Sequence, residues 1–139
     1  MSAELFVDSN VLVYAHDTGA GRRHEVARDL VQRLWRERSG VISTQVLQEV
    51  YVNVRRKAKR PPSREEALEL IEDYESWRVV VNTPRSVVEA IRLEERFQIS
   101  FWDALIVQAA QTAGAETLYT EDLNAGQEYG SVRVVNPFD

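Results

Sequence analysis

The chain has 139 residues, of which 44% are hydrophobic and 28% charged, and this composition predicts one globular domain over residues 1–139. It contains no cysteine, which excludes disulfides and thiolate metal sites, and no apolar run approaches the ~18 residues of a membrane span. The formal net charge of −5 argues by itself against a nucleic-acid binder, although carboxylates that surround a bound cation stop counting as negative. The N-terminal sequence lacks the basic and apolar regions of a signal peptide, so we expect a protein of the reducing cytoplasm.

Short apolar runs alternate with amphipathic helical patterns along the chain. Strands are predicted at residues 5–7, 41–42, 79–81, 116–119 and 132–135. Helices are predicted at residues 11–15, 24–38, 44–60, 63–77, 84–97 and 102–113. Strands that alternate with helices indicate an α/β fold, in which a central, mostly parallel sheet of about five strands carries helices on both faces.

Several residues predict where these helices begin and end. Ser9 or Asn10 is expected to cap the first helix, and the segment 63–66 (SREE) is a capping box for the fourth. Gly40 is expected to end the second helix. Gly114 is expected to end the last one in the left-handed conformation that glycine adopts without strain.

Two apolar stripes at helical spacing are predicted to face the core. Val87, Val88 and Ile91 form the stripe of the fifth helix. The stripe of the last helix begins at Trp102 and continues to Ala113 with a 3.6-residue period. The last helix is therefore expected to be a central element of the fold.

Four acidic residues are predicted to converge at one edge of the sheet, because ligands of open parallel sheets bind beyond the carboxyl ends of the strands. Asp8 directly follows the first strand, Asp122 follows the fourth, and Asp103 opens the helix that leads into the fourth. Glu49 lies on the third helix, about 60° outside its apolar stripe. Converging carboxylates persist mainly where cations neutralise them, and oxygen ligands suit Mg²⁺ or Mn²⁺ rather than zinc.

Each of these acids also has a purely structural interpretation. Asp8 could simply end a strand and start a turn. Asp103 could complete a capping box with Ser100, and Glu49 could be an ordinary solvated residue of a helix. Only the joint arrangement of the acids therefore favours a functional site.

The polar residues next to the acids leave further alternatives open. Glu121 is as plausible an acid after the fourth strand as Asp122. Asn10 and Thr120 are residue types that more often cap helices and turns than contact ligands.

A short basic segment follows the third helix. Five of the 17 basic residues fall within it: Arg55, Arg56, Lys57, Lys59 and Arg60. Cations at a helix C-terminus often only complement the helix dipole, but this many can also grip a phosphate backbone. Because the rest of the chain is acidic, we interpret the segment as a contact for RNA.

Four segments, in this order, together resemble a PIN domain, and more narrowly the VapC-type toxins of bacterial and archaeal toxin–antitoxin pairs. They are residues 6–15 (FVDSNVLVYA), 43–51 (STQVLQEVY), 102–106 (WDALI) and 119–123 (YTEDL). The ending at residues 134–138 (VVNPF) is similar to one branch of that family. Ser9 stands where threonine is more usual, which keeps the hydroxyl group.

The resemblance implies a three-layer α/β/α fold and a Mg²⁺- or Mn²⁺-dependent ribonuclease that leaves 5′-phosphate and 3′-hydroxyl ends. By position, Asp8, Asp103 and Asp122 match the metal-binding aspartates of the family, and Glu49 matches its glutamate. Asn10 and Thr120 match the polar residues that brace the site. It also implies an RNA substrate, a homodimer and a cognate antitoxin that masks the site with a basic side chain. The alternative is a catalytically inactive PIN fold that acts as an RNA-binding or scaffold protein. The complete acid set argues against this alternative.

Overall fold

A computed structural model describes residues 4–139 of the protein; residues 1–3, on which the signal-peptide expectation partly rests, lie outside the described residues. The strands are β1 (Leu5–Val7), β2 (Gly40–Ser43), β3 (Arg78–Val80), β4 (Thr117–Tyr119), β5 (Glu128–Tyr129) and β6 (Val132–Val135). The helices are α1 (Ser9–Ala15), α2 (Arg22–Glu37), α3 (Thr44–Arg56), α4 (Arg64–Tyr74), α5 (Pro84–Phe97) and α6 (Phe101–Thr112).

The six strands of the described chain form one sheet in the order β3-β2-β1-β4-β6-β5, in which every pair is parallel except β5 with β6. The middle strand, β1, pairs Phe6 with Val41 on one side and with Leu118 on the other. All three side chains are fully buried. Burial of each large apolar side chain of this kind stabilises the fold by about 1.5–3 kcal/mol. The predicted mostly parallel central sheet is confirmed.

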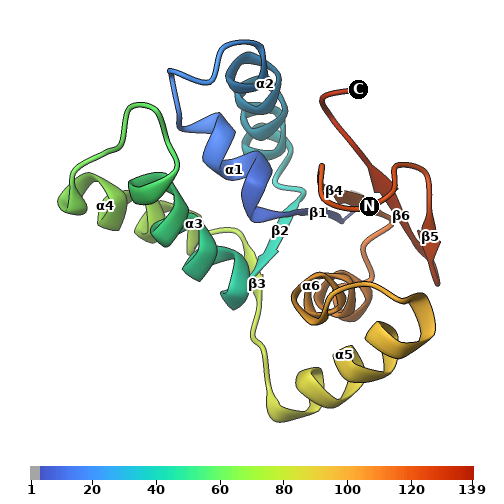
Figure 1. The fold of residues 1–139 in the computed structure, drawn as a ribbon. Coiled ribbons are helices and arrows are strands. Elements are labelled where there is room, and N and C mark those ends of the chain that lie inside the picture. Colours follow the sequence, from blue (N-terminus) through green and yellow to red (C-terminus); the bar gives the residue numbers. More distant parts are fainter. Residues whose placement is uncertain (1–3) are drawn as a thin grey trace.

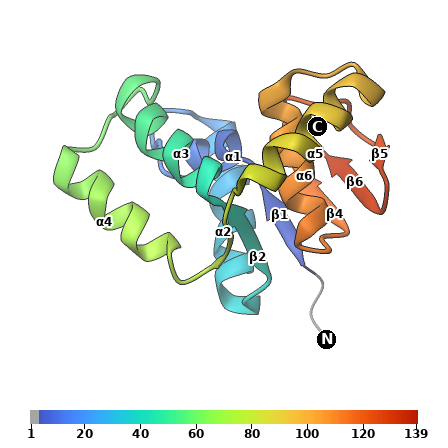
Figure 2. The ribbon, with the colours of Figure 1, turned by 90° about the horizontal axis from the view of Figure 1, so that it is seen from below.

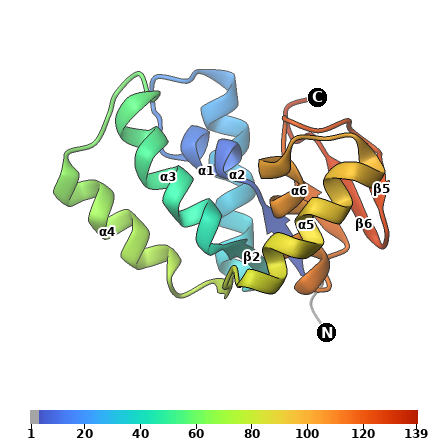
Figure 3. The same ribbon diagram turned by 60° about the horizontal axis from the view of Figure 1, so that its bottom comes forward.

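Helices cover both faces of the sheet (Figure 1). The helix α6 packs on β2, β4 and β6 from one face, with α5 outside it, while α2 packs on β2 and carries α1. Figure 2 shows α5 and α6 on the side of β4 and β6, and Figure 3 shows α4 lying beside α3 at the opposite margin. Among residues 4–139, no helix is long and apolar enough to cross a membrane.

The sheet has one strand more than the five that we predicted. The additional strand, β5, has only two residues and pairs Tyr129 with Val132 through a turn in which Gly130 has a φ of 64°. Two residues are too few for the period-two pattern by which a strand is recognised in a sequence, so the hairpin escaped prediction.

The ends of several helices also differ from the prediction. The helix α3 ends at Arg56 rather than at residue 60, and α4 ends at Tyr74 rather than at residue 77. Asp8, and neither Ser9 nor Asn10, caps α1, because its carboxylate accepts the Ser9 N–H at 2.7 Å. The helix α2 ends at Glu37 and is capped by Arg38, which has a φ of 54°, and Gly40 already belongs to β2. Gly40 is required there for a packing reason: a Cβ atom would lie 2.4 Å from the Trp77 ring.

One stripe of apolar residues does not face the core as predicted. Val87, Val88 and Ile91 are exposed, and α5 instead turns Ser86 and Ala90 inward against α6. The small side chain of Ala90 lets the two helices approach closely, which places the larger apolar residues on the outside.

The stripe of α6 is confirmed except at its first residue. Leu105 and Ile106 are buried, whereas 63% of Trp102 is exposed. At the end of the helix Gly114 has the predicted left-handed conformation, with a φ of 69°. The first turn of α6 therefore reaches beyond the core.

Candidate active site

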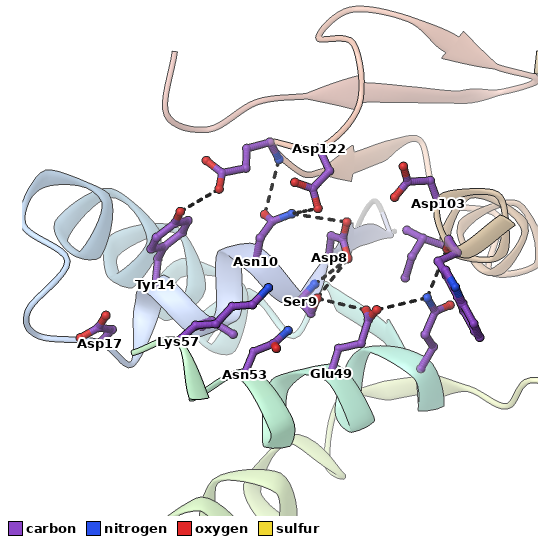
Figure 4. Close-up of a pocket in the computed structure, with 15 residues that line it drawn as sticks. Asp8, Ser9, Asn10, Tyr14, Asp17, Glu49, Asn53, Lys57, Asp103 and Asp122 are labelled. Carbon is purple, nitrogen blue, oxygen red and sulfur yellow. Dashed lines mark hydrogen bonds between the residues drawn. The ribbon is translucent and has the colours of Figure 1, made fainter. Parts of the chain in front are cut away.

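A pocket with a volume of about 330 Å³ lies beyond the carboxyl ends of β1 and β4 (Figure 4). All four acids singled out in the sequence line it. Asp8 directly follows β1, Glu49 lies on α3, Asp103 lies on α6, and Asp122 lies in the loop after β4. Asp8 and Asp122 are 114 positions apart in the chain. They meet in this pocket because parallel strands end at a common edge of the sheet.

Asp8 lines the pocket and is buried. One carboxylate oxygen accepts the Ser9 N–H at 2.7 Å, and the other accepts the Thr120 hydroxyl at 2.9 Å. Burial raises the pKa of Asp8 to about 7, and the negative charges of Glu49 and Asp122 act in the same direction, while the bonds from Thr120 and Ser9 oppose the rise. Without a cation, Asp8 therefore binds a proton much more readily than an exposed aspartate.

Asn10 and Thr120 connect Asp8 with Asp122. Asn10 Nδ2 donates to Asp122 Oδ2 and to Thr120 Oγ1, at 3.0 Å each, and lies 3.5 Å from Asp8 Oδ2. Thr120 Oγ1 also accepts the backbone N–H of Asp122 at 3.1 Å. These contacts hold the two carboxylates on either side of one amide nitrogen.

Glu49 projects from α3 toward the same space (Figure 4). Its carboxylate accepts the Ser9 hydroxyl at 3.1 Å and lies 3.5 Å from Gln45 Nε2. Burial raises the pKa of Glu49, as do the charges of Asp103 and Asp122, whereas the contacts with Ser9 and Gln45 lower it. Glu49 is thus oriented by two neighbours and protonates more readily than an exposed glutamate.

Asp103 occupies the first turn of α6 and is half-buried. Its backbone N–H donates to Ser100 Oγ at 3.1 Å, so Ser100 caps the helix, while the Asp103 carboxylate lines the pocket. Burial raises the pKa of Asp103 and the charge of Asp122 adds to the rise, against the effect of the Ser100 hydroxyl. Asp103 therefore lies in the first turn of a helix and also belongs to the group of acids that line the pocket.

The two acids that follow β4 have different partners. Glu121 accepts a hydrogen bond from the Tyr14 hydroxyl at 2.8 Å and forms an ion pair with Arg23 at 3.2 Å. Asp122 instead faces Asn10 (Figure 4). Glu121 also lines the pocket, but its carboxylate is engaged at the side of α1 and α2.

Lys57 is the member of the basic segment that lines the pocket. All five basic residues of the segment are exposed: Arg55, Arg56, Lys57, Lys59 and Arg60. Arg55 also donates to the Tyr51 hydroxyl at 3.2 Å. Lys57 lies at the pocket next to Asn53 (Figure 4), whereas the other four basic residues are not among the residues that line it.

Sequence reasoning missed several residues of the pocket wall, among them Asp17, Gln45, Asn53 and Trp102. Asp17 is buried and accepts backbone N–H groups from Lys59 at 2.9 Å, Gly19 at 3.0 Å and Arg60 at 3.3 Å. Although burial acts to raise its pKa, these bonds outweigh it and the pKa of Asp17 is lowered. The sequence Asp17-Thr18-Gly19 suggests a turn, but the contact with the basic segment is tertiary.

The donor set of the pocket fits a hydrated Mg²⁺ or Mn²⁺ ion. Within residues 4–139, no three His, Asp or Glu side chains are already arranged to hold a metal ion by themselves. Mg²⁺, however, usually keeps several of its waters and is bound through one or two carboxylates together with phosphate oxygens of the substrate. Asp8, Asp103 and Asp122 supply only oxygen donors. Burial is the main cause of the raised pKa of Asp8, and the smaller effect of the Glu49 and Asp122 charges is one that a bound cation would balance.

Solved structures with the same fold come from bacterial toxin–antitoxin systems. A toxin–antitoxin complex from Klebsiella pneumoniae aligns with a TM-score of 0.69 at 19% identity, over 96% of this chain and 98% of that chain. VapC20 from Mycobacterium tuberculosis, a toxin that cleaves the sarcin–ricin loop, aligns with a TM-score of 0.66 at 21% identity, over 86% of this chain and 92% of that chain. VapBC2 from Rickettsia felis, bound to a fragment of promoter DNA, aligns with a TM-score of 0.65 at 18% identity, over 94% and 96%.

A search of curated proteins found no match to this chain. The general model of one protein family, in contrast, matches nearly the whole sequence. This match, to the PIN domain, extends over residues 5–127 and includes β1, the four acids and β4. The chain therefore belongs to the PIN domain family.

Proposed function

We propose that this protein is a metal-dependent ribonuclease and the toxin of a toxin–antitoxin pair. The observation that carries the proposal is the convergence of four acids on one pocket at the carboxyl edge of a parallel sheet: Asp8, Glu49, Asp103 and Asp122. The fold shared with a toxin that cleaves the sarcin–ricin loop supports RNA as the substrate. The exposed basic segment that begins at Arg55 supports it as well, because positive side chains bind the phosphate backbone.

Asp8, Asp103 and Asp122 would hold Mg²⁺ or Mn²⁺ in this pocket. When bound, such a cation lowers the pKa of a water molecule and neutralises the charge that develops on a phosphodiester. Asn10 and Thr120 keep two of these carboxylates in place, because Thr120 donates to Asp8, and Asn10 donates to Asp122 and lies 3.5 Å from Asp8. Supporting contacts of this kind orient metal ligands.

Glu49 is the residue that we propose for proton transfer. Its carboxylate is fixed by Ser9 and, more weakly, by Gln45, and it faces the same space as the aspartates. Its raised pKa brings it closer to the working pH, which favours a general base that orients and deprotonates the attacking water. Lys57, at the rim, is placed to contact a phosphate next to the one that is cleaved.

An antitoxin that masks the pocket and a homodimer complete the proposal. The structural neighbours from Klebsiella pneumoniae and Rickettsia felis are complexes of a toxin with its antitoxin. An acidic pocket is complementary to a basic side chain of such a partner. The exposed apolar residues of α5, among them Val88 and Ile91, offer a surface for a second copy of the chain.

The decisive experiment compares wild type with Asp8→Asn in a bacterial host and in solution. We expect growth arrest with RNA fragmentation for wild type alone, and cleavage of purified RNA that requires Mg²⁺ or Mn²⁺ and stops in chelator. Asp8→Asn keeps the shape of the side chain, and its amide oxygen can still accept the Ser9 N–H, so the variant should fold. The NH2 group that replaces the second oxygen can only donate, so the hydrogen bond from the Thr120 hydroxyl is lost or reversed. If wild type binds RNA but does not cleave it with either metal, the protein is a catalytically inactive PIN fold instead.

A further inference from the structure

Trp102 lies on the wall of the acidic pocket, and 63% of it is exposed. The residues that follow it on α6 are buried, from Ala104 to Val107. Tryptophan is highly buried on average in folded proteins, because exposure of its large ring to water is unfavourable. Because this exposed tryptophan precedes Asp103 and belongs to the pocket wall, its ring is placed to contact a ligand that binds in the pocket.

Its neighbours hold Trp102 in a defined place. The Phe101 ring packs against the Trp102 ring edge-on, with centroids 5.1 Å apart and an interplanar angle of 77°. The Trp102 carbonyl oxygen accepts a hydrogen bond from Gln45 Nε2 at 3.2 Å. Gln45 also lies 3.5 Å from the carboxylate of Glu49, the proposed base. One residue therefore contacts both the backbone of Trp102 and Glu49. Such a ring loses little freedom when a ligand covers it.

The layout of the pocket shows where an RNA strand would run. In Figure 4 the carboxylates of Asp8 and Asp122 lie between Lys57 on one side and Asp103 on the other. Trp102 precedes Asp103 on α6 and belongs to the same wall. A phosphodiester placed among the carboxylates therefore has a positive side chain toward one end and an aromatic ring toward the other.

We propose that Trp102 is a substrate-positioning residue, whose ring stacks on an unpaired base next to the scissile phosphodiester. This inference rests on the ribonuclease function proposed above. In an A-form duplex both faces of each base are already stacked, whereas unpaired bases in loops can be placed on aromatic side chains. Stacking accepts every base because each has a π-face, so Trp102 selects strandedness rather than sequence.

The test combines variants of Trp102 with RNA that lacks one base. Wild type, Trp102→Phe and Trp102→Ala are compared on a labelled single-stranded oligonucleotide, on the same strand annealed to its complement, and on strands with one abasic nucleotide at successive positions around the mapped cleavage site. Leu68→Ala is the control, because it also removes an exposed apolar side chain but lies outside the pocket wall.

We expect kcat/KM on the single strand to fall by about 5- to 150-fold in Trp102→Ala, the range for loss of one stacked base. Trp102→Phe should recover most of it, and Leu68→Ala should match wild type. For wild type, kcat/KM should fall by a similar factor when one particular base next to the cleaved bond is missing. Trp102→Ala should lose nothing further on that strand, since contacts that depend on each other are not additive. The duplex should be cleaved much more slowly than the single strand.

Three results would overturn the inference. The first is a Trp102→Ala variant that is as sensitive to the abasic nucleotide as wild type, and the second is cleavage of the duplex by wild type as fast as of the single strand. The third is a Trp102→Ala variant that cleaves normally but no longer forms the homodimer or binds the antitoxin, which would assign Trp102 to a protein interface. If wild type binds RNA without cleaving it, the ribonuclease proposal fails, and quenching of tryptophan fluorescence by RNA, lost in Trp102→Ala, still tests the stacking.

Discussion

Asn10 Nδ2 lies 3.0 Å from Asp122 Oδ2, and the same nitrogen lies 3.5 Å from Asp8 Oδ2. One side chain of α1 thereby joins two carboxylates that come from the two ends of the chain. Both carboxylates are negative when a cation is bound, so the N–H groups of Asn10 reduce their repulsion and set their separation. The amide is therefore expected to matter for metal binding without being a ligand itself.

Substitution of Asn10 should weaken metal binding. In Asn10→Ala the carboxylates of Asp8 and Asp122 lose their shared donor, and loss of such a supporting contact typically costs 10- to 100-fold in metal affinity or activity, roughly the effect we expect here. The measurement is RNA cleavage as a function of Mn²⁺ concentration. A variant with the wild-type metal requirement would contradict the bracing role.

Substitution of Asp103 separates a metal ligand from a helix residue. If Asp103 only complements the dipole of α6, Asp103→Asn should cost about 0.3–1 kcal/mol of stability and leave cleavage intact. We expect the reverse: equal or higher stability in chelator, because one repelling charge is gone, and loss of cleavage.

Thermal melts of the same two proteins in Mn²⁺ give a second measure of the Asp103 site. A ligand that binds only the folded state stabilises it by about 2.7 kcal/mol at 100 times its dissociation constant. Wild type should therefore melt at a higher temperature with Mn²⁺ than in chelator, and Asp103→Asn should lose most of this shift. An active variant with an unchanged shift would leave Asp103 as a helix residue only.

The adjacent acids Glu121 and Asp122 offer a matched pair of substitutions. Asp122→Asn should abolish cleavage, since Asp122 faces Asn10 and the aspartates. Glu121→Gln removes the same charge one residue earlier, where the carboxylate is held by Tyr14 and Arg23, and should retain most of the activity. Cleavage assays at a single Mg²⁺ concentration suffice. The opposite ranking would make Glu121 the metal ligand.

The pKa of Asp8 predicts how the stability of the metal-free protein depends on pH. It is about 7 in the folded state against 3.8 as the ordinary value, so between about pH 4 and pH 7 the folded protein binds more protons than the unfolded chain. The contribution of Asp8 to the free energy of unfolding is therefore highest below pH 4 and is lost as the pH rises through 7. Asp8→Asn should flatten this decline, which denaturant titrations in chelator at several pH values would reveal.

Asp17 provides a control of opposite sign for that experiment. Its pKa is lowered in the folded state by backbone N–H groups, so its contribution to stability is present at neutral pH and is lost as the pH falls below its ordinary value. Asp17→Asn should therefore reduce stability at pH 7 and have little effect at strongly acidic pH. If Asp8→Asn and Asp17→Asn changed the pH profile in the same direction, the assignment for Asp8 would be wrong.

The exposed face of α5 predicts how the homodimer is disrupted. Ile91→Asp places a charge among Val87 and Val88, and a charge buried without a partner is strongly unfavourable at an interface. Light scattering should report a dimer for wild type and a monomer for Ile91→Asp, whose folding should be unaffected because Ile91 is exposed in the single chain. A dimer in both proteins would place the interface elsewhere.

Local features of this protein followed from the sequence because they depend on neighbouring residues. Ser63 and Glu66 form both bonds of the predicted capping box, and Gly114 ends α6 with a positive φ. The parallel sheet was also predictable, since β1 and β4 alternate with helices and carry buried apolar residues. From that sheet alone, Asp8 could be placed beyond the end of a strand and near the other acids.

Tertiary structure decided what each exposed or acidic side chain contacts. Glu121 and Asp122 are neighbours with the same chemistry, and the choice between them depends on Tyr14, which is more than 100 residues away in the chain. Trp102 fits the apolar period of α6 and is nevertheless exposed, because the first turn of α6 extends past the sheet to the pocket. Periodicity defines the faces of a helix, but only packing against the rest of the chain determines which residues on a face are covered.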